Sequence, residues 1–121
     1  MEEYAEIVDD LLERSERISD IDSWNGRTVL IRGSSRGIGR AMALRFAEEG
    51  ANLVLLGRTL DADDGKGSLN ETAEMVESVG GKAVVAVCDV RNDEDVIAAV
   101  QTGVDAFGGI DAVICNAGAL F

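Results

Sequence analysis

The sequence contains no histidine, only two cysteines and only two lysines among its 121 residues. Without histidine it has no Ser-His-Asp triad and none of the common zinc sites. The two cysteines, Cys88 and Cys115, make no disulfide framework, and each follows an apolar run, so we expect both to be buried, unpaired thiols at strand ends. No apolar run approaches the roughly 18 residues of a membrane span, and the acidic N-terminus resembles neither a secretory signal nor a transit peptide. We therefore expect a cytoplasmic protein that does not act at a membrane.

Basic residues are few compared with acidic ones. The chain has 12 Asp and 11 Glu but only 9 Arg and 2 Lys, which gives a net charge of −12. Such a surface repels nucleic acid and anionic lipid, so neither is expected as a partner. The composition fits an ordinary soluble acidic surface, and also the surface of a protein from a very salty cytoplasm. Repulsion of an anionic ligand would be screened within about 10 Å at 0.1 M salt, so local donors decide whether it binds.

Short apolar runs alternate with helical patterns after residue 26. Runs of strand length lie at 28–32, 52–56, 83–87 and 111–115, and helical spacing lies at 36–49, 69–79 and 93–107. Nearly continuous apolar strands between helices predict a parallel sheet covered on both faces. The predicted fold class is α/β, half of a doubly wound fold with right-handed crossovers.

Each predicted helix has an apolar stripe that we expect to be its buried face. The stripes are Ile38, Met42 and Phe46 in the first helix, Leu69, Ala73, Val76 and Val79 in the second, and Val96, Val100, Val104 and Phe107 in the third. Either Asn92 or Asp93 is expected to cap the third helix.

The first 24 residues stand apart as an N-terminal extension. Apolar side chains recur at helical spacing among charged ones, at Tyr4, Ile7, Val8, Leu11, Leu12 and Ile18. This pattern predicts an amphipathic helix that docks on its own domain, on a second copy or on a neighbouring domain. The domain itself is expected at residues 25–121.

A glycine-rich turn, Gly33-Ser34-Ser35-Arg36-Gly37-Ile38-Gly39, joins the first predicted strand to the first predicted helix. A helix N-terminus carries unpaired N–H groups and about half a positive charge, which suits a phosphate. Gly33 permits the tight turn, and Gly37 and Gly39 allow close approach of the phosphate and of the helix to the strand. Between a strand and an amphipathic helix, such a turn predicts a site for a dinucleotide.

This turn resembles the cofactor loop of the short-chain dehydrogenase/reductase family, and two further stretches match that family in order. Cys88-Asp89-Val90 follows the third predicted strand, and Cys115-Asn116-Ala117-Gly118 follows the fourth. The resemblance implies a Rossmann-type sheet of strand order 3-2-1-4. It also implies that Asp89 contacts the adenine, and that the Asn-Ala-Gly segment lines the cofactor and braces the sheet.

Two details refine this resemblance. The region 66–74 is similar to the hydroxysteroid-dehydrogenase-like branch of the family. Arg32 stands where the family usually has Thr, and this arginine would either point to solvent or crowd the loop.

Two arginines favour NADP over NAD. Arg58 follows the second strand, where an NAD-selective fold usually has Asp or Glu, and Arg36 lies at the other place where the family carries a basic residue for the 2′-phosphate. One charge-assisted hydrogen bond is worth roughly 1.5–3 kcal/mol, about tenfold or more in affinity. The residues expected to bind NADP are Gly33, Ser34, Ser35, Arg36, Gly37, Ile38, Gly39, Arg58, Asp89, Val90, Asn116, Ala117 and Gly118.

The family's hydride transfer between nicotinamide and a carbonyl or alcohol uses a Tyr, a Lys four residues later and a Ser. The only tyrosine here is Tyr4, and neither Lys66 nor Lys82 follows it at that spacing. We therefore expect no catalytic residue and no metal ligand in these 121 residues, which we interpret as the cofactor-binding portion of an NADP(H)-dependent oxidoreductase. The alternatives are a catalytically dead, stand-alone nucleotide-binding module and a truncated, non-functional product.

A sheet that ends after its fourth strand would leave an unpaired edge. That edge predicts self-association, as a homo-oligomer, or pairing with a chain that supplies the missing strands. The N-terminal helix would prevent this if it covered the open side.

Overall fold

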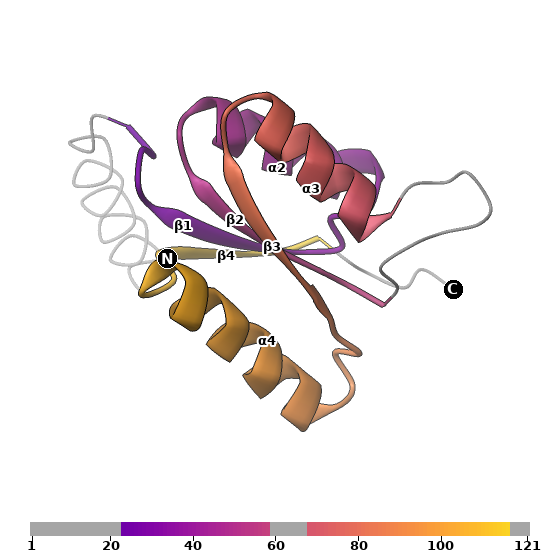
Figure 1. The fold of residues 1–121 in the computed structure, drawn as a ribbon. Helices are drawn as coiled ribbons and strands as arrows, with labels where there is room; N and C mark the ends of the chain where they lie inside the picture. Colours follow the sequence, from indigo (N-terminus) through magenta and orange to yellow (C-terminus); the bar gives the residue numbers. More distant parts are fainter. Residues whose placement is uncertain (1–22, 59–67, 117–121) are drawn as a thin grey trace, which may run out of the picture.

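The computed structural model describes residues 23–58 and 68–116, and in this part of the chain strands and helices alternate (Figure 1). In chain order the elements are β1 (Thr28–Arg32), α2 (Gly37–Glu48), β2 (Asn52–Gly57), α3 (Leu69–Ser78), β3 (Lys82–Val87), α4 (Asp93–Phe107) and β4 (Ala112–Cys115). Every strand and helix predicted within the described residues is therefore confirmed, with ends that differ by no more than one or two residues. The predicted N-terminal helix, with its docking, lies outside them. No helix in the described ranges is both long and apolar enough to cross a membrane.

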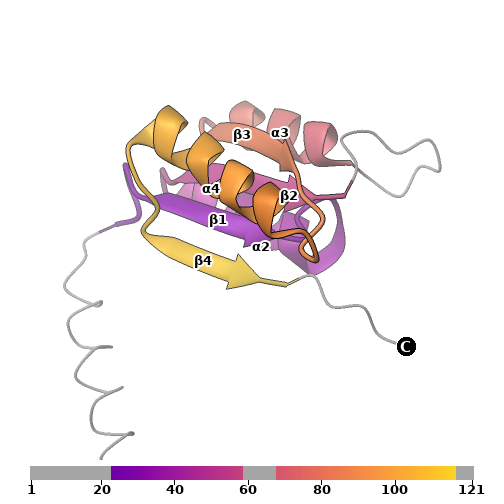
Figure 2. The same cartoon turned by 90° about the horizontal axis from the view of Figure 1, so that it is seen from below.

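The sheet is parallel throughout and has the strand order β3-β2-β1-β4, as predicted. The helices α2 and α3 cover one face, and α4 covers the other (Figures 1 and 2). The chain adds strands in one direction from β1 to β3 and then returns to place β4 on the other side of β1. The strand order therefore reverses between β1 and β4, which opens a crevice at the carboxyl ends of these strands.

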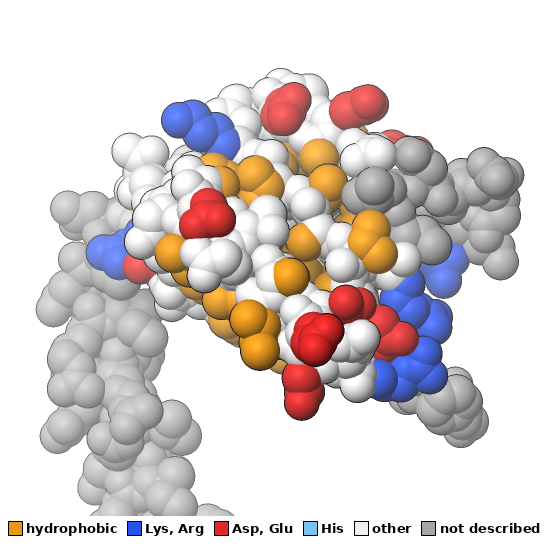
Figure 3. Space-filling view, turned by 60° about the horizontal axis from the view of Figure 1, so that its bottom comes forward, with side chains coloured by type: hydrophobic (Ala, Val, Ile, Leu, Met, Phe, Trp, Pro, Cys, Tyr) orange, Lys and Arg blue, Asp and Glu red, His pale blue; other side chains and the backbone are white. Residues whose placement is uncertain are grey.

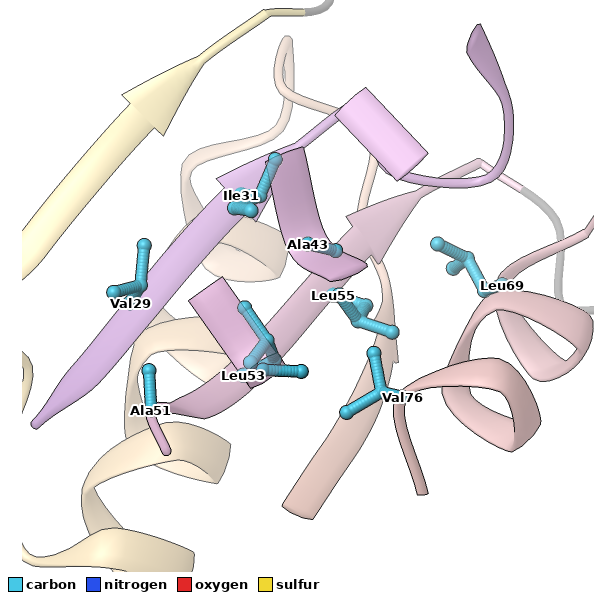
Figure 4. Packing of buried hydrophobic residues seen from close by; sticks show 9 residues of the cluster. Val29, Ile31, Ala43, Ala51, Leu53, Leu55, Leu69 and Val76 are labelled. Carbon is cyan, nitrogen blue, oxygen red and sulfur yellow. The ribbon is translucent and has the colours of Figure 1, made fainter. Parts of the chain in front are cut away.

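Apolar side chains fill both faces of the central strands. Toward α2 and α3, Val29 and Ile31 of β1 and Leu53 and Leu55 of β2 are completely buried (Figure 4). Toward α4, the alternate strand residues pack with Cys88 and with Ala99 of the helix. Strands buried on both sides read as continuous apolar runs, which is why the sequence pattern located them well.

The predicted buried face of α2 is only partly right: Met42 and Phe46 pack, partly buried, against the core, but the fully buried residues lie one position further along the helix. The residues in contact with the sheet are the small ones, Gly39, Ala43 and Ala47, whereas Ile38 is 71% exposed. Small side chains let the helix lie close to the strands, and the larger residues then fall at its flanks. Phe46 is one of these, and its ring meets the edge of Trp24 at a centroid distance of 5.0 Å.

The same shift occurs in α4. Ala99 and Gly103 are buried under the helix, whereas Val100 and Val104 of the predicted stripe are more than a third exposed. A Cβ at Gly103 would lie 2.8 Å from a methyl group of Val54, so a larger residue does not fit between the helix and β2. In α3 the predicted stripe is buried at Leu69 and Val76, but Val79 at its end is 44% exposed.

The two cysteines are both free thiols, as predicted, but only Cys88 is buried. The expectation that Cys115 is buried is wrong. The helix α4 packs mainly over β1, β2 and β3, and the β4 side chains on that face, including Val113 at 60%, are exposed.

Candidate functional site

A cleft of about 710 Å³ lies at the carboxyl ends of the strands. Each strand end contributes to its lining, with Arg32 at β1, Gly57 at β2, Cys88 after β3 and Asn116 after β4. This is the crevice produced by the reversal of strand order, where doubly wound folds bind their ligands. Its volume lies within the range of small-molecule and cofactor sites.

The N-terminus of α2 faces this cleft and differs from the other helix starts. Its N-cap residue, Arg36, makes no side-chain capping bond, and the first turn contains no acidic residue. By contrast, the Ser68 hydroxyl caps α3, and the Asn92 side chain caps α4, which decides between the two predicted caps of the third helix. The first N–H groups of a helix have no partner within it, so the start of α2 is suited to an anion.

The glycine-rich turn has the backbone that this arrangement requires. Gly33 and Gly37 have φ values of +80° and +61°, a region that other residues seldom adopt. A Cβ at Gly39 would collide with the carbonyl oxygen of Gly33, so only glycine permits this contact between helix and turn. Gly37 lines the cleft, whereas Gly39 is buried behind it.

The residues of the turn divide into two groups by position. Ser35, Arg36, Gly37 and Ile38 line the cleft, and Ile38 provides its exposed apolar surface there. Ser34 is completely buried, and its hydroxyl donates to the carbonyl oxygen of Ile31 at 3.1 Å. Ser34 therefore holds the turn on β1 rather than facing the cleft.

Arg40 was not singled out from the sequence, yet it fixes the shape of the turn. From the second turn of α2 its guanidinium donates to the Ser35 carbonyl oxygen at 2.7 Å, to the Thr72 hydroxyl at 2.9 Å and to the Glu71 carboxylate at 2.7 Å. Only 18% of its side chain is exposed. Arg40 thus links the glycine-rich turn to the start of α3, and no local sequence signal reveals a contact across this separation.

Four arginines line the cleft: Arg32, Arg36, Arg58 and Arg91. Among the described residues of the lining the only acidic one is Asp89, so this part of the cleft is locally basic although the whole chain carries a net charge of −12. In Figure 3 the largest group of basic side chains lies at one end of the molecule, while acidic side chains are spread over other parts of the visible surface. Arg32 is half-buried in the lining and does not simply point to solvent.

Asp89 and Val90 both lie in the cleft wall, at the start of the turn that leads into α4. The Arg91 guanidinium donates two hydrogen bonds to the Asp89 carboxylate, from Nε to Oδ1 at 3.0 Å and from Nη2 to Oδ2 at 2.9 Å. These hydrogen bonds, together with one from the Arg91 backbone N–H, lower the pKa of Asp89 to about 2. Arg91 is the second cleft residue that the sequence analysis did not single out.

Asn116 joins the two strands on either side of the crevice. Its backbone N–H donates to the Arg32 carbonyl oxygen at 3.2 Å, and its side-chain amide donates to the Gly33 carbonyl oxygen at 3.4 Å. Asn116 therefore supports the glycine-rich turn from β4 and also lines the cleft. Ala117 and Gly118, predicted as its neighbours in the site, lie outside the described residues.

Cys88 is the only nucleophilic thiol in the cleft lining of the described residues. Burial raises its pKa, and the nearby carboxylates of Asp95 and Asp89 raise it further. A thiol of raised pKa is largely protonated at neutral pH and is a poor nucleophile. We therefore assign Cys88 a packing role beneath the cleft.

A family model of short chain dehydrogenases matches residues 27–120. The chain belongs to this family. Hydroxysteroid dehydrogenase-like protein 2 of Xenopus laevis is 45% identical over 96 residues, which are 78% of this chain and 23% of that protein. The chain therefore spans about a quarter of this curated relative's length.

Solved structures of short chain dehydrogenases have the same arrangement. A short chain dehydrogenase from Mycobacterium thermoresistibile matches with a TM-score of 0.78 and 40% identity, over 82% of this chain and 36% of that one. Carveol dehydrogenase from Mycobacterium avium, solved in complex with NAD, matches with a TM-score of 0.70 and 33% identity, over 78% of this chain and 36% of that one. As a short chain dehydrogenase, the chain belongs to a family of oxidoreductases that bind a nicotinamide dinucleotide.

The groups that the described residues bring to the cleft are few in kind. Within residues 23–58 and 68–116, no cluster of three or more His, Cys, Asp or Glu side chains could hold a metal ion. The full sequence contains no Tyr followed four residues later by Lys. What the cleft offers is a helix N-terminus, basic side chains and one hydrogen-bond-accepting carboxylate.

Proposed function

We propose that these 121 residues are the cofactor-binding portion of an oxidoreductase that uses NADP(H). The observation that carries the proposal is the uncapped start of α2, which faces a cleft lined by Arg36 and Arg58 at the reversal of strand order. When bound, the nicotinamide would accept or supply a hydride. We propose the substrate only as a class, a carbonyl compound or an alcohol. The groups that bind this substrate are likewise proposed only as a class.

The diphosphate is proposed to lie against the start of α2. The backbone N–H groups of Gly33 and Ser34 both point to the Leu56 carbonyl oxygen, at 2.9 and 3.4 Å, and are not free for a ligand. We propose that the phosphate binds N–H donors of the first helical turn, from Gly37 onward, because the first N–H groups of a helix have no partner within it. Arg40 supports this arrangement because it holds the Ser35 carbonyl on the opposite side, toward α3.

The preference for NADP is proposed to come from Arg36 and Arg58. Both side chains are exposed at the cleft, and Gly57 and Arg58 stand at the end of β2, where an NAD-selective site would hold the ribose hydroxyls with an Asp or Glu. The 2′-phosphate carries about −1.5 to −2 charges at pH 7. A guanidinium can meet it with two parallel hydrogen bonds, so we expect each arginine to contribute to the preference.

Calorimetric titration of the 121-residue chain with NADP⁺ and with NAD⁺ tests this proposal. We expect NADP⁺ to bind at least about tenfold more tightly, as one charge-assisted contact would provide. In the double variant Arg36→Ala/Arg58→Ala, NADP⁺ should weaken to the affinity of NAD⁺, and NAD⁺ itself should change little. Arg45→Ala is the matched control, because it removes one charge from the same helix away from the cleft.

The two parts of the proposal fail in different ways. Equal or tighter binding of NAD⁺ by the unaltered chain would overturn the NADP preference and leave the dinucleotide site standing. Binding of neither dinucleotide would overturn the site itself.

A further inference from the structure

The Arg36 side chain lies at the cleft without a hydrogen bond of its own to hold it there. Arg36 is the N-cap residue of α2, it lines the cleft, and it makes no side-chain capping bond. Within residues 23–58 and 68–116, its guanidinium takes part in none of the ion pairs or side-chain hydrogen bonds. The direction in which this side chain leaves the main chain is therefore set by the backbone on either side of its Cα.

Both peptide groups that flank the Cα of Arg36 are held by one residue, Arg40. On the N-terminal side, Arg40 Nη2 donates to the Ser35 carbonyl oxygen at 2.7 Å. On the C-terminal side, the Arg40 backbone N–H donates to the Arg36 carbonyl oxygen at 3.3 Å. Peptide groups are planar, so the two that meet at a Cα fix the direction of its Cα–Cβ bond. Arg40 therefore sets the direction in which the Arg36 side chain starts.

Of these two bonds, only the one to the Ser35 carbonyl depends on the side chain at position 40. The other is the opening bond of α2 and forms with the backbone of any residue except proline. Arg36 is extended, with φ −162° and ψ 176°, so the helix itself does not fix the Ser35–Arg36 peptide. The Thr72 hydroxyl also reaches the Ser35 carbonyl oxygen, at 3.3 Å, and the guanidinium of Arg40 makes the shorter contact.

The Arg40 guanidinium is in turn held by α3. Its Nε donates to Thr72 Oγ1 at 2.9 Å and its Nη1 donates to Glu71 Oε1 at 2.7 Å, and only 18% of the side chain is exposed. A planar guanidinium held at all three nitrogens keeps one orientation. Arg40 is not part of the cleft lining, so any effect that it has on a ligand there passes through the turn.

We propose that Arg40 is a positioning residue that aims Arg36 into the cleft and so contributes to the preference for NADP over NAD. This inference rests on the proposed NADP(H) site, in which Arg36 meets the 2′-phosphate. Without the bond to Arg40, the Ser35–Arg36 peptide can rotate, and the Arg36 side chain starts in more than one direction. Ordering it again on binding costs free energy. This cost falls on NADP⁺ alone, because NAD⁺ has no 2′-phosphate for Arg36 to meet.

Two other roles of Arg40 predict different results. If Arg40 only stabilised the fold, its loss would weaken NADP⁺ and NAD⁺ by the same factor and leave the ratio of their affinities unchanged. If its positive charge acted on the 2′-phosphate from a distance, the ratio would fall even in a chain without Arg36. The ratio and its dependence on Arg36 therefore separate positioning from both alternatives.

The test is calorimetric titration of the full 121-residue chain with NADP⁺ and with NAD⁺. If Arg36 and Arg58 share a tenfold preference equally, Arg36→Ala should lower the affinity ratio by about threefold. Arg40→Met should lower it by about twofold to threefold. In the double variant Arg36→Ala/Arg40→Met the ratio should fall no further than in Arg36→Ala, because Arg40 then has no guanidinium to position.

The control is Arg45→Met, which removes an ion-paired arginine from the same helix outside the cleft and should leave the ratio unchanged. Arg40→Lys keeps the charge but replaces the planar fork with one ammonium group. It should lower the ratio by a smaller factor than Arg40→Met and disturb the fold less. Thermal unfolding of each variant without ligand shows which are folded, and if Arg40→Met is not, the same cycle is run with Arg40→Lys.

An unchanged ratio in the folded Arg40 variants, together with a ratio that depends on Arg36, would overturn the positioning role and leave the proposed function intact. An equal fall of the ratio with and without Arg36 would overturn it too, in favour of a charge effect. If the unaltered chain does not prefer NADP⁺, or if Arg36→Ala keeps the full preference, the proposed role of Arg36 fails first, and this inference fails with it.

Discussion

Gly39 shows at the scale of one residue how the cleft depends on an absent side chain. It is buried where α2 meets the glycine-rich turn, and a Cβ there would collide with the Gly33 carbonyl oxygen and lie 3.0 Å from the Asn116 side-chain amide. Both of these groups belong to the frame of the cleft. Any larger residue must therefore move the turn, the helix or β4.

We expect Gly39→Ala to lower the free energy of unfolding by about 1–3 kcal/mol, as overpacking of a tight contact does. It should also weaken dinucleotide binding, because the start of α2 moves relative to β1. Urea denaturation and calorimetric titration measure the two effects. Gly109→Ala is the matched control, since an added Cβ there meets nothing within 4 Å, and an equal loss in both variants would contradict the explanation.

The ionisation of Asp89 gives a second prediction at this scale. Its pKa of about 2 in the folded chain lies below the ordinary value of about 3.9. A lowered pKa means that the pair stabilises the fold above about pH 4 and that this contribution is lost as the pH falls toward 2. In carbon-13 NMR the Asp89 carboxyl signal should titrate near pH 2, and in Arg91→Gln it should move up toward its ordinary value.

The control for this titration is Arg45→Gln, which should leave the Asp89 signal where it is. A carboxyl signal that titrates near pH 4 in the unaltered chain would show that the ion pair does not persist in solution.

At the scale of elements, the start of α2 and the start of α3 act as one unit. Arg40 in α2 and Thr72 in α3 both donate to the Ser35 carbonyl oxygen, and the Thr72 hydroxyl also lies 3.2 Å from the Ser68 carbonyl oxygen. Thr72 is completely buried. The glycine-rich turn is therefore fixed by contacts with two helices, α2 and α3, as well as by its contacts with β1.

We expect Arg40→Met to destabilise the chain by about 2–3 kcal/mol, since it removes hydrogen bonds from a charged donor to partly buried acceptors. Arg45→Met, on the same helix, should cost less than about 0.5 kcal/mol, because its two ion pairs with Glu48 and Glu49 are exposed. Denaturant unfolding of both variants gives the comparison. Similar losses would mean that the Arg40 contacts carry no more weight than a surface pair.

At the scale of the whole molecule, the two faces of the sheet are covered unequally. Among the described elements, two helices pack on one face, whereas α4 is the only helix on the other, where it packs over β1, β2 and β3. Apolar side chains are consequently exposed on this side, at Ile97, Val100, Val104 and Val113. Exposed apolar side chains on and near the edge strand of a sheet favour association.

We expect the 121-residue chain to self-associate through this side. The double variant Ile97→Lys/Val113→Lys should shift it toward the monomer, because charge on an edge strand and on the helix beside it opposes docking. Sedimentation velocity at several protein concentrations measures the shift. Val79→Lys is the control, since Val79 is an isolated exposed side chain at the end of α3, and an unaltered chain that stays monomeric throughout would refute the expectation.

The sequence by itself determined the order of the elements, the strand order and the place of the glycine-rich turn. The order of the elements and the place of the turn depend on local patterns: runs of apolar residues that are buried on both faces, glycines where φ is positive, and a turn between a strand and a helix. The strand order was predicted from the resemblance to a known family. The motifs that carry this resemblance also placed Arg36, Arg58, Asp89 and Asn116 in one site, and the structure brings all four to one cleft because the carboxyl ends of parallel strands meet at one edge.

Only the tertiary structure decided which helix faces are buried and how the cleft is held. The fully buried residues of α2 are glycine and alanine rather than its large residues, because the spacing between helix and sheet, not hydrophobicity alone, sets which side chains fit. The contacts of Arg40 with Thr72, 32 positions away, and the fork of Arg91 on Asp89 have no sequence signal. Such contacts depend on distances and side-chain rotations in three dimensions, which no periodicity along the chain records.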